Sequence, residues 1–575
     1  MIVRVVVIVL IAATGFAVCA SPPRLIAQSE ELEKPALFPD GTLVAFSLQT
    51  LEGVQRMVGR SSTDDGETWS AGQPAFSLPR EAGTFGYWVV VVDRAGEAHF
   101  FFLHDPSTGS VGSGTGVGSP GKKERLNVWH ASWRAGGGGQ PPHQIWEGRG
   151  GDLQSAIQLA SGRLLLPISY RVTRSWRERG PGFAAFTYPG QFNATALYSD
   201  DGGRTWRQSP SVLMVPAPDL GTILGAVEPV VLQLKDGRVW MLIRTQTGRF
   251  YESYSKDDGV SWRQPTPTDL ISSDSPAGLV RLTDGGILLL VNRCLRYPYA
   301  YGGRHVLHAA VSADEGRTWT GFREVVRDPL RNETPPGGGD FGVSYPFTSL
   351  DSKGRVVFGL GVRTGTRSQH PEKVVSGAPQ APRWMVVVDP AWLYETRQRT
   401  DFSEGLEDWS IFGTRGVGLA AHPSKPGAKV LRLAKPETVW PAGAVWNFPL
   451  AARGRISLKI KLEPSFSGAL FGLTDHFSVP FDAEDRFFNL FNLQLDAQGA
   501  VAGAGRIEPD RWHTLVLAWD LARQRAEVFL DGRAFFSLRL GREAPGACYL
   551  RVRSTAPATD DGGLLVESVD FEADR

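Results

Sequence analysis

Acidic and hydroxyl side chains recur along this sequence with a spacing that suggests half of a calcium-binding loop. The first group is STDDGETW (62–69), and the pattern returns as SDDGGRTW (199–206), SKDDGVSW (255–262) and SADEGRTW (312–319). These loops lack the bidentate glutamate that completes an EF-hand calcium site. Ser and Asp side chains also bond readily to turn backbone, and the Trp can pack beneath the turn. We therefore interpret the four segments, called boxes below, as structural turns and predict no metal site.

Glu228 is a second candidate for a chemical role, because it stands within the apolar run VEPVVLQL (227–234). A carboxylate in such a run is costly to bury without a partner, so its presence favours a functional role. In contrast, His130, His143 and His305 are isolated in the sequence. We interpret these histidines as structural. No pattern indicates nucleotide binding, a catalytic zinc cluster or a serine hydrolase.

A second repeat shows which elements must position these residues. Glycine-containing turns precede apolar strands in six segments: FPDGTLVAF (38–46), DRAGEAHFFFL (93–103), ASGRLLLPIS (160–169), KDGRVWMLIR (235–244), TDGGILLLVN (283–292) and SKGRVVFGLG (352–361). The turn residues favour tight hairpins, and the runs that follow are typical of buried strands. A repeat of about sixty residues predicts an all-β fold, a six-bladed β-propeller over residues 30–395.

The composition changes near residue 400. The segment RWHTLVLAWDLARQRAEVFLDGRAFFSLRL (511–540) predicts alternating strands joined through Asp531-Gly532. It resembles the laminin-G and concanavalin-like domains, in which a Trp-His-x-Leu strand precedes a strand that ends in Asp-Gly. We therefore predict one β-sandwich of the jelly-roll type over residues 400–575.

The N-terminus and the overall charge limit the environment and the partners of the protein. MIVRVVVIVLIAATGFAVCA (1–20) predicts a secretory signal peptide, with a retained membrane anchor as the alternative. We expect the mature protein to be secreted or periplasmic, without a membrane span. The 61 basic and 60 acidic residues nearly cancel, which argues against nucleic acid as the main partner.

Boxes of this pattern on a six-bladed scaffold resemble the Asp-box (BNR) repeats of the sialidase, or neuraminidase, superfamily. The resemblance covers residues 30–395 and implies glycan substrates and no cofactor. Sialidases use a tyrosine nucleophile activated by a glutamate, an aspartate acid/base, and three arginines that hold the substrate carboxylate. A neutral tyrosine suits an anionic substrate, which would repel a carboxylate nucleophile. Arginine suits the carboxylate because its planar fork makes two parallel bonds.

The resemblance assigns roles to several residues. In SYPFTSLDSKGRVVFGLG (344–361), Tyr345 matches the nucleophile, and Glu228 matches the activating glutamate. Either Arg244 or Arg249 matches the second substrate arginine, and Arg304 matches the third.

The first blade departs from the family pattern. In LEKPALFPDG, Glu33 stands where the first arginine is expected, with Lys34 beside it. The next loop, SLQTLEGVQRMVGRS, offers only Glu52 for the acid/base role, and Asp340 in GGGDFGVSY is the other carboxyl candidate. A glutamate in place of the arginine would repel sialic acid, so we expect an altered substrate.

The first function hypothesis is an exo-glycosidase that removes terminal sugars, of the sialic acid type or other, with retention through a glycosyl–tyrosine intermediate. The alternative is a catalytically silent glycan-binding propeller, which the altered first blade favours. A polysaccharide lyase ranks last.

Overall fold

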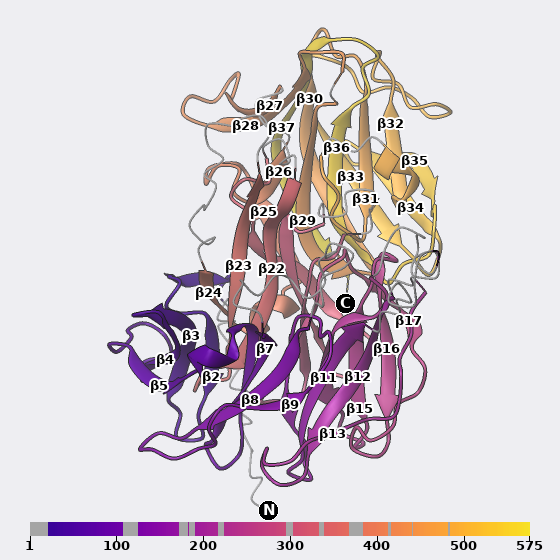
Figure 1. Cartoon of the computed structure of the whole chain (residues 1–575). Helices are drawn as coiled ribbons and strands as arrows, with labels where there is room; N and C mark the ends of the chain where they lie inside the picture. The colour runs from indigo at the N-terminus through magenta and orange to yellow at the C-terminus, as the bar shows by residue number, and fades with distance from the viewer. Residues whose placement is uncertain are drawn as a thin grey trace, which may run out of the picture.

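The computed structural model describes residues 21–106, 125–171, 182, 190–216, 224–294, 303–332, 338–366, 383–411, 416–439, 441–480 and 484–574. The predicted signal peptide lies outside these residues. Figure 1 shows two β-rich domains, with the C-terminal one packed against the propeller. Among the helices of the described residues, none is both long and apolar enough to cross a bilayer.

The first half of the propeller consists of three four-stranded antiparallel sheets. Blade 1 contains β2 (Lys34–Leu37), β3 (Leu43–Leu51), β4 (Val54–Ser62) and β5 (Gln73–Ser77). After the short 3₁₀ helix η1 (Arg80–Ala82), blade 2 contains β6 (Thr84–Val92), β7 (Ala98–Asp105), β8 (Asn127–Trp133) and β9 (His143–Trp146). Blade 3 contains β10 (Ile157–Gln158), β11 (Leu164–Arg171), β12 (Phe192–Ser199) and β13 (Arg207–Gln208).

Three further sheets complete the ring. Blade 4 contains β14 (Val227–Gln233), β15 (Val239–Arg244), β16 (Arg249–Ser255) and β17 (Thr266–Ile271). Blade 5 contains β18 (Gly278–Arg281), β19 (Ile287–Val291), β20 (Val306–Ser312) and β21 (Thr320–Arg327). Blade 6 contains β22 (Gly338–Leu350), β23 (Val356–Thr366), β24 (Arg383–Val388) and, as its outer strand, β1 (Arg24–Gln28). Strand β1, which precedes residue 30, therefore closes the ring.

The antiparallel order gives the propeller two different rims. The innermost strand of each blade starts at one rim and ends in a glycine turn at the other, where the third-to-fourth strand connections with the boxes also lie. In blade 4 the turn closes through a bond from the Gly237 amide to the Leu234 carbonyl at 3.0 Å. Gly237 has φ 86°, which glycine adopts without steric cost. We call the two rims the entry rim, where the inner strands start, and the turn rim.

Each box is a closed turn, as the blade 3 box illustrates. Ser199 Oγ donates to Asp201 Oδ1 at 2.8 Å and accepts from the Gly203 amide at 2.9 Å. Asp201 accepts from the Thr205 amide at 2.9 Å and from its hydroxyl at 2.7 Å, while Trp206 Nε1 donates to the Gly203 carbonyl at 2.9 Å. The other boxes repeat the serine, glycine and aspartate bonds. Both carboxylate oxygens are thus engaged within the turn.

The C-terminal domain consists of two sheets that enclose one core. The larger sheet contains β25 (Arg397–Thr400), β27 (Val417–Ala421), β28 (Lys429–Lys435), β30 (Arg453–Leu462), β33 (Trp512–Asp520), β34 (Arg525–Leu530), β35 (Arg533–Arg539) and β37 (Asp560–Ala573). The smaller sheet contains β26 (Trp409–Ile411), β29 (Gly443–Ala451), β31 (Ala469–Thr474), β32 (Phe491–Leu495) and β36 (Ala547–Ser554). Phe448 of the smaller sheet stacks on Phe571 of the larger, with ring centroids 4.5 Å apart. Two 3₁₀ helices, η5 (Pro390–Tyr394) and η6 (Glu484–Phe487), lie in the connections.

The sandwich packs on the outer part of blade 5. Phe477 of the sandwich belongs to a buried apolar cluster that includes Phe322 of β21. Tyr549 donates to Glu324 Oε1 at 2.6 Å, and the Glu324 amide donates to Asn447 Oδ1 at 2.9 Å. Because these groups are buried, the interface combines apolar packing with satisfied polar contacts.

Candidate active site

Two bulged inner strands bring Glu228 and Tyr345 to the entry rim. The pairing register of β14 shifts between Val227 and Val230, and that of β22 shifts between Ser344 and Phe347. Within these bulges Glu228 has φ 45° and Tyr345 has φ 60°, a left-handed conformation that costs a non-glycine residue about 1 kcal/mol. Bulges re-aim side chains, and strained backbone concentrates at functional sites.

Tyr345, Glu228 and Arg244 form a hydrogen-bonded triangle. The Tyr345 hydroxyl donates to Glu228 Oε1 at 3.1 Å and accepts from Arg244 Nη1 at 3.0 Å. Arg244 Nη1 also forms an ion pair with Glu228 Oε2. The sheet register explains the contact, because Arg244 at the end of β15 lies opposite Val227. The arrangement places a carboxylate within hydrogen-bond reach of the phenolic proton.

Asp274 and Arg304 extend this triangle. Asp274 Oδ1 accepts from Arg244 Nε at 2.7 Å, and the Asp274 carbonyl accepts from Arg304 Nη2 at 2.6 Å. The guanidinium carbon of Arg304 lies 5.4 Å from the centre of the Tyr345 ring. Two guanidinium groups and two carboxylates thus surround one tyrosine.

These neighbours set the protonation states of the site. Burial, reinforced by the negative charge of Glu228, raises the pKa of Tyr345 well above 10.0, although Arg244 and Arg304 act against the shift. Burial acts to lower the pKa of Arg244, but the negative charges of Asp274 and Glu228 outweigh it and raise that pKa well above its ordinary value. The phenol is therefore protonated at neutral pH. It can act as a nucleophile only if a base, here Glu228, accepts its proton.

Lys34 is a buried cation at the start of β2. Its Nζ donates to the Trp88 carbonyl and lies 3.7 Å from the centre of the Phe347 ring. Burial lowers the pKa of Lys34 to about 7, although the nearby carboxylate of Glu33 acts to raise it. Glu33 itself lies 3.7 Å from Lys34 Nζ and 3.3 Å from Arg383 Nη2, so its charge is balanced inside the protein.

A narrow cavity of about 270 Å³ runs between the inner strands of all six blades, and Lys34 lines it. Gln154, which also lines the cavity, donates to the Pro346 carbonyl at 3.1 Å, directly after Tyr345. Asp152 is buried, and its negative charge acts to raise the pKa of Tyr345 and opposes the lowering of the Lys34 pKa. Asp152 therefore lies electrostatically close to both groups.

Two of the remaining predicted residues, Arg249 and Glu52, are not part of this cluster. Arg249 begins β16 with an exposed side chain that donates to the Thr268 carbonyl at 3.2 Å, so Arg244 is the one that meets Glu228. Glu52 stands at the tip of the β3–β4 hairpin, with a side chain 88% exposed and 3.8 Å from Arg56. Asp340 lies in β22, and its side chain is outside the described residues.

Asp274, Asp152 and Lys34 were not predicted as site residues. Asp274 and Lys34 share a local pattern with Glu228 and Tyr345, because each stands one or two residues before a proline in or just before an inner strand. Aligning these prolines would have identified Asp274 and Lys34. Asp152 precedes β10 without a proline and has no such signal.

Comparison with known proteins supports the assignment of the repeats. Residues 152–358 match the model of the BNR repeat-like domain. A sialidase of Micromonospora viridifaciens is 27% identical over 321 residues, a match that covers 49% of this chain and 44% of that protein. The chain therefore spans less than half the length of this relative.

Similar solved structures include a Trypanosoma rangeli sialidase in complex with the inhibitor DANA. It is 13% identical, with 95% of this chain and 92% of that chain covered and a TM-score of 0.40. A protein of unknown function from Dyadobacter fermentans is 16% identical, with 64% of this chain and 98% of that chain covered and a TM-score of 0.42.

Proposed function

We propose that the protein is a secreted or periplasmic glycosidase of the sialidase type, which removes terminal sugars from glycans with retention of configuration. The BNR match and the similarity to a sialidase support the family. The observation that carries the chemistry is the hydrogen bond of 3.1 Å between the Tyr345 hydroxyl and Glu228 Oε1. This pair joins a protonated phenol to a carboxylate in a buried setting, as an activated nucleophile requires.

In the first step, the Tyr345 oxygen attacks the anomeric carbon while Glu228 accepts the phenolic proton. The bond between the anomeric carbon and the leaving oxygen breaks, and that oxygen takes a proton from a carboxylic acid. In the second step, water gives a proton to the carboxylate left by that acid and replaces Tyr345 at the anomeric carbon, and Glu228 returns its proton to the phenolate. Two inversions at one carbon give net retention.

Three carboxyl groups are candidates for the acid: Glu52, Asp340 and Asp152. The hairpin that carries Glu52 extends beyond Lys34, which pairs with Phe46, whereas β3 ends at Leu51. The five strand residues that follow Phe46, as far as Leu51, span about 17 Å. Glu52 therefore lies beyond Lys34 at the entry rim and could protonate only a substrate that extends to the tip of this hairpin. Asp152 interacts electrostatically with Tyr345, since its negative charge acts to raise the pKa of that tyrosine.

The alternative is a glycan-binding protein without turnover. It is favoured by Glu33, whose carboxylate stands at the start of the first blade and is held by Arg383. In this case the sandwich, which we propose to be a laminin-G or concanavalin-like domain, would contribute glycan binding, and the propeller would present a second pocket.

Tyr345→Phe tests the proposal with a matched control. We expect the variant to fold and to lose about 10³-fold or more in kcat/KM on 4-methylumbelliferyl α-sialosides and on a panel of neutral 4-methylumbelliferyl glycosides. Tyr254 is the control, because it also donates to a glutamate, Glu252 Oε2, at 3.0 Å, but on the outer part of blade 4. Tyr254→Phe should retain activity. Glycan binding by the wild type without turnover of any substrate would support the binding protein instead.

A further inference from the structure

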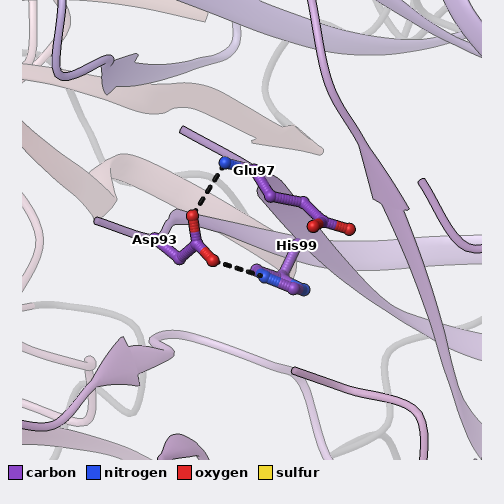
Figure 2. Close-up of side chains that lie close together, drawn as sticks. All are labelled: Asp93, Glu97 and His99. Atoms are coloured by element: carbon purple, nitrogen blue, oxygen red, sulfur yellow. Dashed lines mark hydrogen bonds and ion pairs between the residues drawn. The ribbon is translucent and has the colours of Figure 1, made fainter. Parts of the chain in front are cut away.

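The hairpin between β6 and β7 brings three ligand-type side chains to one face of blade 2. The Asp93 amide donates to the Glu97 carbonyl at 2.9 Å, so these residues lie opposite each other across the turn. His99 follows Glu97 by two positions and therefore points to the same side of the sheet. Figure 2 shows the carboxylate of Asp93 directed at the His99 ring, with Glu97 beside both.

The nitrogen that faces this cluster is buried and makes no hydrogen bond. His99 is 1% exposed in its side chain, and its Nε2 lies 3.6 Å from Asp93 Oδ2, without a hydrogen-bond partner among the described residues. The other ring nitrogen, Nδ1, lies 3.1 Å from His130 Nε2. His130, interpreted from the sequence as a structural histidine, therefore contacts His99 in the folded chain.

From this geometry we propose that Asp93, Glu97 and His99 bind a divalent transition-metal ion, best matched by Zn²⁺, with water as a further ligand. One atom from each residue lies within 4.8 Å of the others. Tetrahedral zinc, with ligands at about 2.0–2.2 Å, has ligand–ligand edges of about 3.4 Å, close to the separation between Asp93 and His99. One imidazole and two carboxylates suit zinc better than calcium or magnesium, which prefer oxygen alone.

The surrounding contacts would orient the ligands. A hydrogen bond from His99 Nδ1 to His130 would direct Nε2 toward the ion, as the outer contacts of metal-binding histidines do. Asp93 Oδ1 accepts from the amides of Ala95 and Glu97, at 2.9 and 2.8 Å, which leaves Oδ2 for the metal. Glu97 Oε2 forms an ion pair with Arg134 at 2.7 Å. Because the Arg134 side chain is 51% exposed, it can move away when a metal takes its place.

The position of the cluster indicates a structural role. At the blade junctions of the turn rim, the residue after the box aspartate contacts a neighbouring blade: Asp65 accepts from Ser352, the Asp258 carbonyl accepts from Arg163, and Glu315 Oε2 accepts from the Lys235 amide. In the blade 3 box this residue is Gly202, whose carbonyl accepts from Gln140 Nε2 of blade 2 at 2.7 Å. At the same junction His130 packs on Trp206, with ring centroids 5.5 Å apart. An ion held by Asp93, Glu97 and His99 would fix His130 and thereby join blade 2 to blade 3.

Zinc titration of the chelator-treated protein tests this site. We expect calorimetry to give one Zn²⁺ per chain and thermal melts to show a rise in Tm, since a ion that binds only the folded state stabilises it. Co²⁺ should give the visible d–d bands of a tetrahedral site. Asp93→Asn keeps the turn-capping oxygen but removes the carboxylate charge, and we expect it and His99→Gln to weaken binding more than about 100-fold.

Two further variants make the test specific to this cluster. Arg134→Gln removes the cation that competes for Glu97, so it should tighten Zn²⁺ binding about 2- to 5-fold, the worth of a partly exposed ion pair. His143→Gln is the control, because His143 lies in the same blade but its Nδ1 lies 3.0 Å from the Pro141 carbonyl, outside the three proposed ligands. The absence of saturable zinc binding, or unchanged affinity in Asp93→Asn and His99→Gln, would overturn the proposal. Neither result depends on glycosidase activity.

Discussion

At the turn rim of the propeller four blades repeat one arrangement, the box, whereas at the entry rim five blades contribute different side chains to the site. The boxes hold their aspartates in short hydrogen bonds to the same turn, and those bonds, first from the Thr205 amide, lower the pKa of Asp201 to about 2. At the entry rim, Glu228 and Tyr345 occupy left-handed backbone in bulges, beside buried cations.

The two rims therefore differ in role: the boxes at the turn rim stabilise the propeller, and the cluster at the entry rim carries the proposed chemistry. Satisfied local turns stabilise the blades independently of their neighbours. Buried charges and strained backbone are costly, and they persist where the surrounding structure holds them. Substitutions at the two rims should therefore change different observables: folding free energy at the turn rim and turnover at the entry rim.

The largest effect is expected from Glu228→Gln. Glutamine retains the volume and can still contact Tyr345, but it cannot accept the phenolic proton. We expect kcat/KM to fall about 10³-fold, equivalent to about 4 kcal/mol, as measured with the 4-methylumbelliferyl substrate that the wild type hydrolyses best. Binding of the free sugar product, measured by calorimetry, should change far less. A variant with more than a tenth of wild-type activity would refute the role of Glu228 as the base.

The same two rims explain what the sequence could predict. Boxes and glycine turns depend on residues within eight positions, so their pattern predicts a six-bladed all-β fold, and six four-stranded sheets are present. The Glu228–Tyr345 contact joins residues 117 positions apart, and it was predicted only through the family resemblance. The choice between Arg244 and Arg249 required the register of β14 and β15. Strand β1 joined blade 6 without any turn signal, because its partner lies at the far end of the domain.

Asp201→Ala should break one turn without affecting the chemistry. The variant loses the bonds to Ser199 and Thr205, and we expect the free energy of unfolding to fall by about 1–2 kcal/mol. Denaturant unfolding measures this change, while activity per folded molecule should stay at the wild-type level. The adjacent Asp200 is the control, because its side-chain partner among the described residues is Arg163, in an ion pair of 2.6 Å in which Asp200 is 52% exposed. Asp200→Ala should therefore cost less than about 1 kcal/mol. Equal losses in the two variants would contradict a special role for the box aspartate.

The smallest effect, and one of opposite sign, is expected from Lys34→Met. Since the pKa of Lys34 is about 7 in the folded protein against 10.5 ordinarily, the folded state binds fewer protons than the unfolded state between these values. The cost of the buried ammonium is therefore full below about pH 7 and disappears as the pH rises toward 10.5. Methionine avoids this cost, so the variant should gain about 1–2 kcal/mol at pH 6 and progressively less at pH 8 and 9. Urea unfolding at these pH values measures the gain, with Lys235→Met as the control, because Lys235 is 56% exposed on the turn rim and should show little change. A loss of stability at pH 6, or a gain independent of pH, would mean that the entry rim does not hold Lys34 at a cost to the fold.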